Sequence, residues 1–239
     1  MHLAITDSGQ RYLDAQRQQQ AAQQPVHRPL DAPDGPDHAR VLQCQHHQRP
    51  VEHTLDEDDA DEVRSALGLE PDNIDGLLLP ETYSYTTGTR DIDILRRSRE
   101  HMVAFLEKSW AQRAQGLPYK TPYDALIMAS IIEKETGKAA ERPLIASVFI
   151  NRLRKGMRLQ TDPTVIYGIK DRYDGNIRKA DLQDDNPYNT YLIEGLPPTP
   201  IAMPGKAAIR AALHPASSHY LYFVAKGGGE HHFSRTLAE

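Results

Sequence analysis

The chain has 239 residues, of which 39% are hydrophobic and 26% are charged, and its formal net charge is −5. This balance is typical of a soluble globular protein and argues against a nucleic-acid-binding surface, which needs clustered lysine and arginine. The single cysteine, Cys44, excludes an internal disulfide framework and a multi-cysteine zinc site.

Residues 1–50 differ in composition from the rest of the chain. They are rich in glutamine, histidine and proline and carry few apolar residues at helical or strand spacing. Such a segment buries too little surface to offset its ordering entropy. We therefore predict a disordered or aberrant N-terminal segment at 1–50 and a folded domain at 51–239. The sequence shows no signal peptide and no apolar run long enough for a membrane span.

The first part of the folded domain predicts two helices separated by an extended segment. Residues 53–71 read as a short helix with an acidic first turn. Residues 77–86 (LLLPETYSYT) favour a strand or an extended loop. Residues 91–116 have apolar side chains near helical spacing and a glycine at the end, which predicts a long amphipathic helix.

The remainder predicts two more helices, a long irregular region and a hairpin. Helices are expected over 121–137 and 141–156, and a loop or strand over 157–169. The proline-rich residues 170–206 predict loops. Residues 220–234 alternate on either side of three glycines, which indicates a β-hairpin. The expected fold class is α+β, with a helical core and a small antiparallel sheet at the C-terminus.

Two glutamates lie two positions apart in the segment IIEKETG, residues 131–137. Residues two apart on a helix point in nearly opposite directions, so Glu133 and Glu135 cannot share a site. Glu135 follows isoleucine and methionine at helical spacing, whereas Glu133 follows alanine and serine. The pattern places Glu135 on the apolar face and predicts that Glu133 points toward a wetter side.

The position of Glu135 has two interpretations. A carboxyl group that is buried without a cationic partner keeps its proton near neutral pH, and a protonated carboxyl group there is a general acid. Alternatively, Glu135 has a structural role, reaching solvent or pairing with Arg142 or Arg152. Periodicity selects Glu135 over Glu133 and leaves these two roles open.

Several motifs carry a resemblance to a known family, from about Val51 to the end of the chain. The sequence resembles the catalytic domain of the MltG (YceG-like) family of endolytic murein transglycosylases. The motifs are ASIIEKETG, ERPLIASVFINRLRKGMRLQTDPTVIYG, NPYNTYLIEGLPPTPIAMPG and HPASSHYLYFVAKGGGEHHFS.

The resemblance implies cleavage of the β-1,4 bond between MurNAc and GlcNAc within peptidoglycan strands, leaving 1,6-anhydro-MurNAc ends. The family's catalytic glutamate is the second one of EKET, which here is Glu135. Such a reaction needs one carboxyl group and no cofactor or metal. The matching motif positions also imply a set of substrate-binding residues: Asn151, Gln160, Thr161, Asp162, Tyr188, Asn189 and Tyr191.

Some of these residues have ordinary structural explanations. Asp162 precedes a proline, so it either orders a loop or faces substrate. Asn151 and Arg152 at a helix end either orient Glu135 or bind free carbonyls. His231 and His232 are neighbours on a predicted strand and point to opposite faces, which argues against a shared metal ion.

The resemblance also shows what the sequence lacks. Family members carry a membrane anchor helix and a LysM-like module before the catalytic domain, and residues 1–50 match neither. We expect a truncated or frameshifted gene product. The family acts at the periplasmic face of the inner membrane, with peptidoglycan strands as substrate and peptidoglycan synthases as candidate partners. Two competing functions remain: an inactive glycan-binding remnant, and a glycoside hydrolase that uses Glu135 and Asp162.

Overall fold

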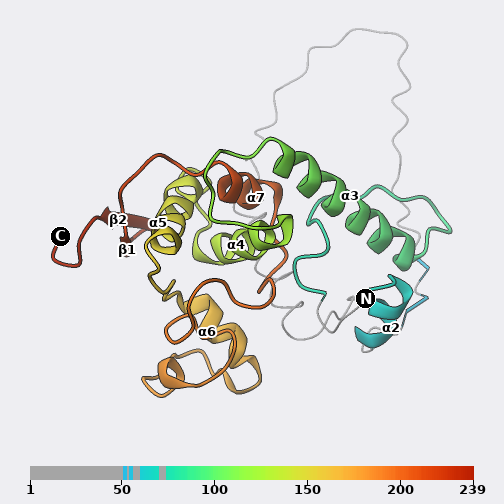
Figure 1. The fold of residues 1–239 in the computed structure, drawn as a ribbon. Coiled ribbons are helices and arrows are strands. Elements are labelled where there is room, and N and C mark those ends of the chain that lie inside the picture. The colour runs from blue at the N-terminus through green and yellow to red at the C-terminus, as the bar shows by residue number, and fades with distance from the viewer. Residues whose placement is uncertain (1–50, 53, 56–59, 70–73) are drawn as a thin grey trace, which may run out of the picture.

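The computed structural model describes residues 51–52, 54–55, 60–69 and 74–239. Short 3₁₀ turns lie at Lys170–Arg172 and Asp181–Gln183. The α+β class, with a helical core and a C-terminal antiparallel hairpin, is confirmed (Figure 1). In chain order, the elements are α2 (Ala60–Ala66), α3 (Asp91–Ala111), α4 (Pro122–Glu135), α5 (Arg142–Arg154), α6 (Asp162–Gly168), α7 (Lys206–Leu213), β1 (Tyr222–Gly227) and β2 (Glu230–Ser234).

Helix α4 is the centre of the core. It begins with a capping box in which the Thr121 hydroxyl accepts from the Asp124 backbone N–H and the Asp124 carboxylate accepts from the Thr121 N–H. Every residue from 125 to 132 is buried, so the helix is covered on all sides. Helices α3, α5 and α7 provide this cover (Figure 1), and the closest packing is against α7. Glu135 is the last helical residue.

Helix α7 was not predicted, because residues 206–213 follow a proline-rich region that indicated loops. The segment KAAIRAAL nevertheless has apolar side chains at helical spacing, and five of them are buried against α4: Ala208, Ile209, Ala211, Ala212 and Leu213. Pro204 and the N-cap Gly205 precede its first turn. The irregular region thus ends where it was expected to end, and the segment that follows it, for which no element was predicted, forms part of the core.

Helix α6 corrects the prediction of a loop or strand over 157–169. Thr161 is the N-cap and Pro163 lies in the first turn, where a missing N–H costs nothing. The hydroxyl of Thr161 makes no capping bond to the helix, because it donates to Glu135 instead. Residues 77–86 were predicted to form a strand or an extended loop, and they form an irregular segment without a strand.

The C-terminal hairpin is the predicted one. Strands β1 and β2 pair antiparallel, with Phe223 opposite Phe233, and glycines form the turn. The His231 ring lies 2.7 Å from the Glu141 carboxylate, and Lys138 pairs with Glu230 at 2.7 Å. These contacts fix the hairpin beside the N-terminus of α5 (Figure 1).

The structure describes only part of the N-terminal region for which predictions were made. The predicted disordered segment 1–50 lies outside the described residues, as does most of the acidic turn before α2. Among the helices that are described, none has the length and apolarity that a bilayer crossing requires.

Candidate active site

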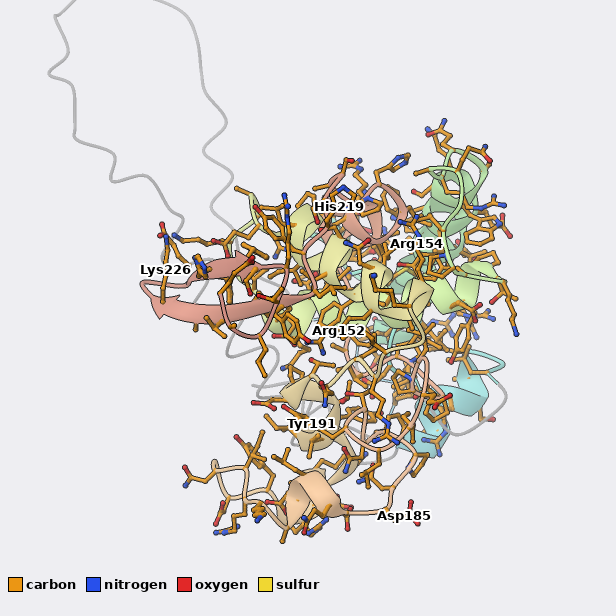
Figure 2. All side chains as sticks on the ribbon, turned by 60° about the vertical axis from the view of Figure 1, so that its left-hand side comes forward. Arg152, Arg154, Asp185, Tyr191, His219 and Lys226 are labelled. Carbon is orange, nitrogen blue, oxygen red and sulfur yellow. The ribbon has the colours of Figure 1, made fainter. Side chains whose placement is uncertain are left out.

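A cavity of about 200 Å³ opens at the C-terminal end of α4. One wall comes from the segment that leads into α6, another from α5 and the hairpin, and Tyr191 belongs to a loop beside α6. Figure 2 shows Arg152 near the base of the hairpin and Tyr191 beside α6. The lining residues are Glu135, Phe149, Arg152, Leu159, Gln160, Thr161, Asp162, Tyr191 and Phe223.

Glu135 lies in this cavity without a basic partner. The helix ends at this residue, the following Thr136 is extended and buried, and the Glu135 side chain lines the cavity. Burial raises the pKa of Glu135 to about 7, and the nearby Asp162 charge also raises it. Within the described part of the chain, Glu135 forms no salt bridge. The carboxyl group is therefore poised to hold or release a proton near neutral pH.

Thr161 provides the hydrogen bond to this carboxyl group. Its hydroxyl donates a short hydrogen bond to Glu135 Oε1, which lowers the pKa of Glu135 and partly offsets the effect of burial. The Thr161 backbone N–H donates to Thr190 Oγ1 at 3.0 Å, and the Gln160 N–H donates to the Thr190 carbonyl at 3.1 Å. Two bonds to Thr190 thus hold the Thr161 segment in place opposite the acid.

Gln160 has a left-handed backbone, with φ of 50°. Among the described residues it is the only non-glycine residue with positive φ. This conformation is uncommon for a side chain such as glutamine and persists only where the surroundings hold it. Because it lies directly before Thr161, the turn at Gln160 sets the direction in which the Thr161 hydroxyl points.

Asp162 and Tyr191 form the outer part of the cavity. The Tyr191 hydroxyl donates to Asp162 Oδ1 at 2.7 Å. Asp162 is exposed and begins α6, so it both starts a helix and lines the cavity. Of the predicted site residues, the structure therefore brings Glu135 and four others together: Gln160, Thr161, Asp162 and Tyr191.

Three predicted substrate residues do not line the cavity. Asn189 is fully buried and donates to the carbonyls of Asp181 and Asp184, while its side-chain oxygen accepts from the Tyr191 N–H. It therefore orders the loop that carries Tyr191.

The other two tie further segments together. Asn151 donates to the carbonyls of Ser218 and Tyr220 at 3.0 Å each and so anchors the segment before the hairpin. Tyr188 packs on Tyr167, with 4.7 Å between ring centroids, and its hydroxyl lies 2.8 Å from Thr199 Oγ1. The Asn151 and Tyr188 side chains therefore hold together chain segments around the cavity.

The sequence analysis did not assign Phe149, Leu159 or Phe223 to the site. Phe149 and Phe223 meet edge to face, with ring centroids 5.6 Å apart, and give the cavity an apolar wall. Phe149 lies on α5, and no signal in the sequence links a hairpin phenylalanine to a helix seventy-odd residues earlier. Arg152, considered as a carbonyl ligand, binds the carbonyls of Leu159 and Leu221 at 2.7 Å each.

The prediction that Glu133 points to a wetter side is wrong. Its side chain is only 12% exposed; it lies 3.4 Å from the Arg142 guanidinium and accepts from the Gly205 N–H at 2.9 Å. The turn before α7, which was not predicted, covers this face of α4. Arg142, one of the two arginines considered for Glu135, thus binds the other glutamate.

The histidines of β2 have no common ligand geometry. His231 contacts Glu141, and His232 is exposed on the other side of the strand. Within the residues described, no group of three histidine, cysteine, aspartate or glutamate side chains is placed to hold a metal ion. The chemistry that this cavity supports is proton transfer by one carboxyl group beside an apolar wall and several hydrogen-bonding groups.

A family model described as the YceG-like family matches residues 8–239. The match includes residues 8–50, which the sequence analysis placed outside the resemblance. An endolytic murein transglycosylase of Bacillus subtilis is 43% identical over 169 residues, covering 70% of this chain and 46% of the relative. One from Streptococcus pneumoniae is 34% identical over 159 residues, covering 64% of this chain and 28% of the relative.

The fold has a solved counterpart. A crystal structure of a YceG-like protein from Listeria monocytogenes superposes with a TM-score of 0.62 at 36% identity, covering 76% of this chain and 63% of that one. The chain thus spans about half the length of the Bacillus relative and less of the Streptococcus one.

Proposed function

The chain belongs to the YceG-like family, and from this premise we propose that it is a lytic transglycosylase that acts on peptidoglycan. The similar proteins from Bacillus subtilis and Streptococcus pneumoniae are named endolytic murein transglycosylases. In this proposal the substrate is the β-1,4 bond between MurNAc and GlcNAc, the product end is 1,6-anhydro-MurNAc, and Glu135 is the catalytic residue.

One observation carries the proposal: a carboxyl group with a pKa of about 7 lies in a cavity, accepts from a hydroxyl group and has no salt-bridge partner among the described residues. A carboxyl group of ordinary pKa would be ionised at neutral pH and could not donate a proton. An arginine partner would hold it ionised as well. Glu135 has neither limitation, so it can serve as an acid first and as a base afterwards.

The reaction balances with this one group. Glu135 gives its proton to the glycosidic oxygen as the bond from C1 breaks, and C1 develops oxocarbenium character. The Glu135 carboxylate then takes the proton of the C6 hydroxyl of the same sugar, and that oxygen bonds to C1. The proton returns to Glu135, no water is consumed, and the released end is an internal anhydro ring.

The Thr161 hydroxyl supports both halves of this cycle. It stabilises the carboxylate that forms when the proton leaves, because a hydrogen bond to the charged form favours that form. The apolar wall of Phe149 and Phe223 suits the CH face of a sugar ring, and Gln160 and Tyr191 supply polar groups for its hydroxyl and N-acetyl substituents.

A second candidate is a glycoside hydrolase, because Asp162 lies in the same cavity as Glu135. Two carboxyl groups can divide the acid and the base or nucleophile roles, and water then enters the product. The Tyr191 hydroxyl donates to Asp162, which occupies one of its oxygens. The two reactions differ in their products: anhydro ends for the transglycosylase and reducing ends for the hydrolase.

The test is product analysis on purified peptidoglycan strands by mass spectrometry. We expect anhydro ends from the unaltered protein and none from Glu135→Gln. Glu194→Gln is the matched control, since Glu194 is exposed and lines no part of the cavity. Reducing ends that disappear in Asp162→Asn would establish the hydrolase instead, and intact strands with a folded protein would leave a glycan-binding remnant.

The setting of this activity is part of the same proposal. We place the catalytic unit within 51–239, and its site of action outside the cytoplasmic membrane, where peptidoglycan lies. Peptidoglycan synthases are the proposed protein partners. Fractionation of cells that express the chain, with the activity followed in each fraction, tests the location; activity confined to the cytoplasmic fraction would contradict it.

A further inference from the structure

Arg152 is a buried cation in the wall of the cavity. It comes from the last turn of α5, and the residue is only 8% exposed. Its Nε donates to the Leu221 carbonyl at 2.7 Å, and its Nη1 donates to the carbonyls of Leu159 and Arg158 and to Gln160 Oε1, at 2.7, 3.3 and 3.4 Å. All of these acceptors are neutral oxygens.

The charge of Arg152 has no counter-ion among the residues described. Arg142, which has similar cover, pairs with Glu133, whereas Arg152 forms no salt bridge among the described residues and lies over the face of the Tyr222 ring, 5.1 Å from its centroid. Burial lowers the pKa of Arg152, which means that desolvation opposes its charged form. A buried cation is costly unless an anion or a strong acceptor meets it.

One nitrogen of the guanidinium is still available. Within the described residues Nη2 of Arg152 has no hydrogen-bond partner, and it still reaches solvent, whereas Nε of Arg142 has no partner and is sealed from solvent. Because Arg152 is otherwise covered and lines the cavity, the cavity is where Nη2 meets solvent. Its two N–H groups can therefore receive an oxygen of a bound molecule.

The proposed reaction makes an uncompensated cation at this place unfavourable. C1 of the sugar becomes positive in the transition state, and a nearby guanidinium would repel it unless an oxygen of the substrate offset the charge. The Asp162 carboxylate accepts from Tyr191 and, among the described residues, forms no salt bridge with Arg152. The substrate itself has to bring that oxygen.

MurNAc differs from GlcNAc by a lactyl ether at C3, whose acyl oxygens are a carboxylate in strands without peptides and an amide carbonyl in strands with them. We propose that Nη2 of Arg152 binds an acyl oxygen of this lactyl group and so selects MurNAc over GlcNAc in the cavity. This assignment rests on the proposed function. It gives Arg152 a role in substrate specificity in addition to its bonds to the cavity walls.

The first experiment leaves Arg152 intact. Binding is measured with the Glu135→Gln protein, which prevents turnover, and three tetrasaccharides: MurNAc–GlcNAc repeats with free lactyl carboxylates, the same repeats with amidated lactyl groups, and a GlcNAc tetramer. We expect affinity to fall in that order, with the tetramer at least about tenfold weaker than the carboxylate form, since a hydrogen bond to a charged group contributes more than a neutral one.

The second experiment compares two arginines of α5 in the same Glu135→Gln background. Arg152→Met should abolish the preference for lactyl-bearing sugars, so that the ratio of their affinity to that of the GlcNAc tetramer approaches one, whereas Arg152→Lys should retain part of the preference. The readout is this ratio, because loss of the Arg152 bonds to the cavity walls changes the affinity for all three sugars alike. Arg154→Met is the control, because Arg154 is exposed and, within the described residues, its hydrogen bond goes to the Gly116 carbonyl (Figure 2).

The outcomes separate the two proposals. Equal binding of all three sugars by the protein with Arg152 intact would overturn the lactyl assignment and leave the proposed function standing, and this readout does not depend on how well an Arg152 variant folds. Absence of binding to every sugar would overturn both. A preference for lactyl sugars that persists in Arg152→Met would place the selecting group elsewhere and also overturn the assignment.

Discussion

Glu133 and Glu135 occupy opposite sides of the last turn of one helix, and both are largely covered. On the Glu133 side, the carboxylate meets the Arg142 guanidinium and the Gly205 N–H in front of α7. On the Glu135 side, the carboxyl group meets the Thr161 hydroxyl and a cavity. The two glutamate side chains are therefore covered to a similar extent but have different hydrogen-bond partners.

This comparison shows that the partners of a buried glutamate determine its chemistry. The Arg142 guanidinium and the Gly205 backbone N–H both donate to the Glu133 carboxylate, which makes a fixed structural contact on this side. A hydroxyl group in a cavity offsets burial only in part, so the pKa of Glu135 rises to about 7. The first side locks two helices together, and the second can exchange a proton.

The largest expected effect is on catalysis. Glu135→Gln should lower the rate of strand cleavage by about a thousandfold or more, because a general acid–base contributes about 10²- to 10⁴-fold and here one group performs both steps. Glu133→Gln should keep most of the activity per folded molecule. The measurement is anhydro-end formation, normalised to the folded fraction by circular dichroism. Equal losses of activity in Glu135→Gln and Glu133→Gln would contradict the assignment of different roles to the two glutamates.

The next effect is on stability and depends on pH. The pKa of Glu135 is raised in the folded protein, so the unfolded chain loses this proton first as pH rises from about 4.5 to about 7. The unaltered protein is thereby destabilised over this window, and Glu135→Gln is not. The variant should equal the unaltered protein at pH 4 and be more stable above pH 7, by up to about 3 kcal/mol.

Urea unfolding of both proteins at pH 4 and pH 8 measures this difference. All other titrating groups are common to the two proteins, so their contributions cancel. A variant that is less stable at pH 8 than the unaltered protein would show that Glu135 has a stabilising partner in its charged form.

Glu133, by contrast, should stabilise the folded protein. Glu133→Ala leaves the Arg142 guanidinium and the Gly205 N–H without their acceptor, and we expect a loss of about 2 kcal/mol of unfolding free energy at pH 8. Glu194→Ala, at an exposed position, should change stability little. Urea unfolding checks both, and a Glu133 variant as stable as the Glu194 control would remove the structural role from this side.

The smallest expected effect is a shift in the pH at which cleavage declines. Cleavage should decline above about pH 7, where Glu135 loses its proton. Thr161→Val removes a hydrogen bond that lowers the pKa of Glu135, so the decline should move to higher pH. Asp162→Asn removes a charge that raises it, so the decline should move to lower pH. Rate profiles from pH 5 to 9 measure both, and shifts in the same direction would contradict the assignment.

The sequence predicted on which side of its helix Glu135 lies but did not predict the cover of Glu133, for physical reasons. Helical spacing alone selects the side of α4 on which Glu135 lies, because that information is local. The cover on Glu133 comes from the turn at Gly205, far along the chain, so periodicity in α4 could not reveal it. The short helix α6 was missed although Thr161 and Pro163 are ordinary start signals, because its apolar pattern is too brief to register.

The cavity itself was partly predictable. Gln160, Thr161 and Asp162 were found through their motif, and the left-handed turn at Gln160 has no signature in a residue that rarely adopts it. Asn189 was expected to face substrate and instead binds backbone, since a buried amide in a loop satisfies carbonyls as readily as it binds sugars. Phe223 reaches the cavity only through the placement of the hairpin, which depends on Glu141 and His231.

The position of α7 also has a consequence for how the chain is made. Helix α4 is buried on every side over residues 125–132, and its main neighbour, α7, follows only after the irregular region. A chain that grows from its N-terminus therefore completes α4 before the helix that covers it exists. Ribosome-bound chains that end before residue 206 leave the α7-facing surface of α4 exposed.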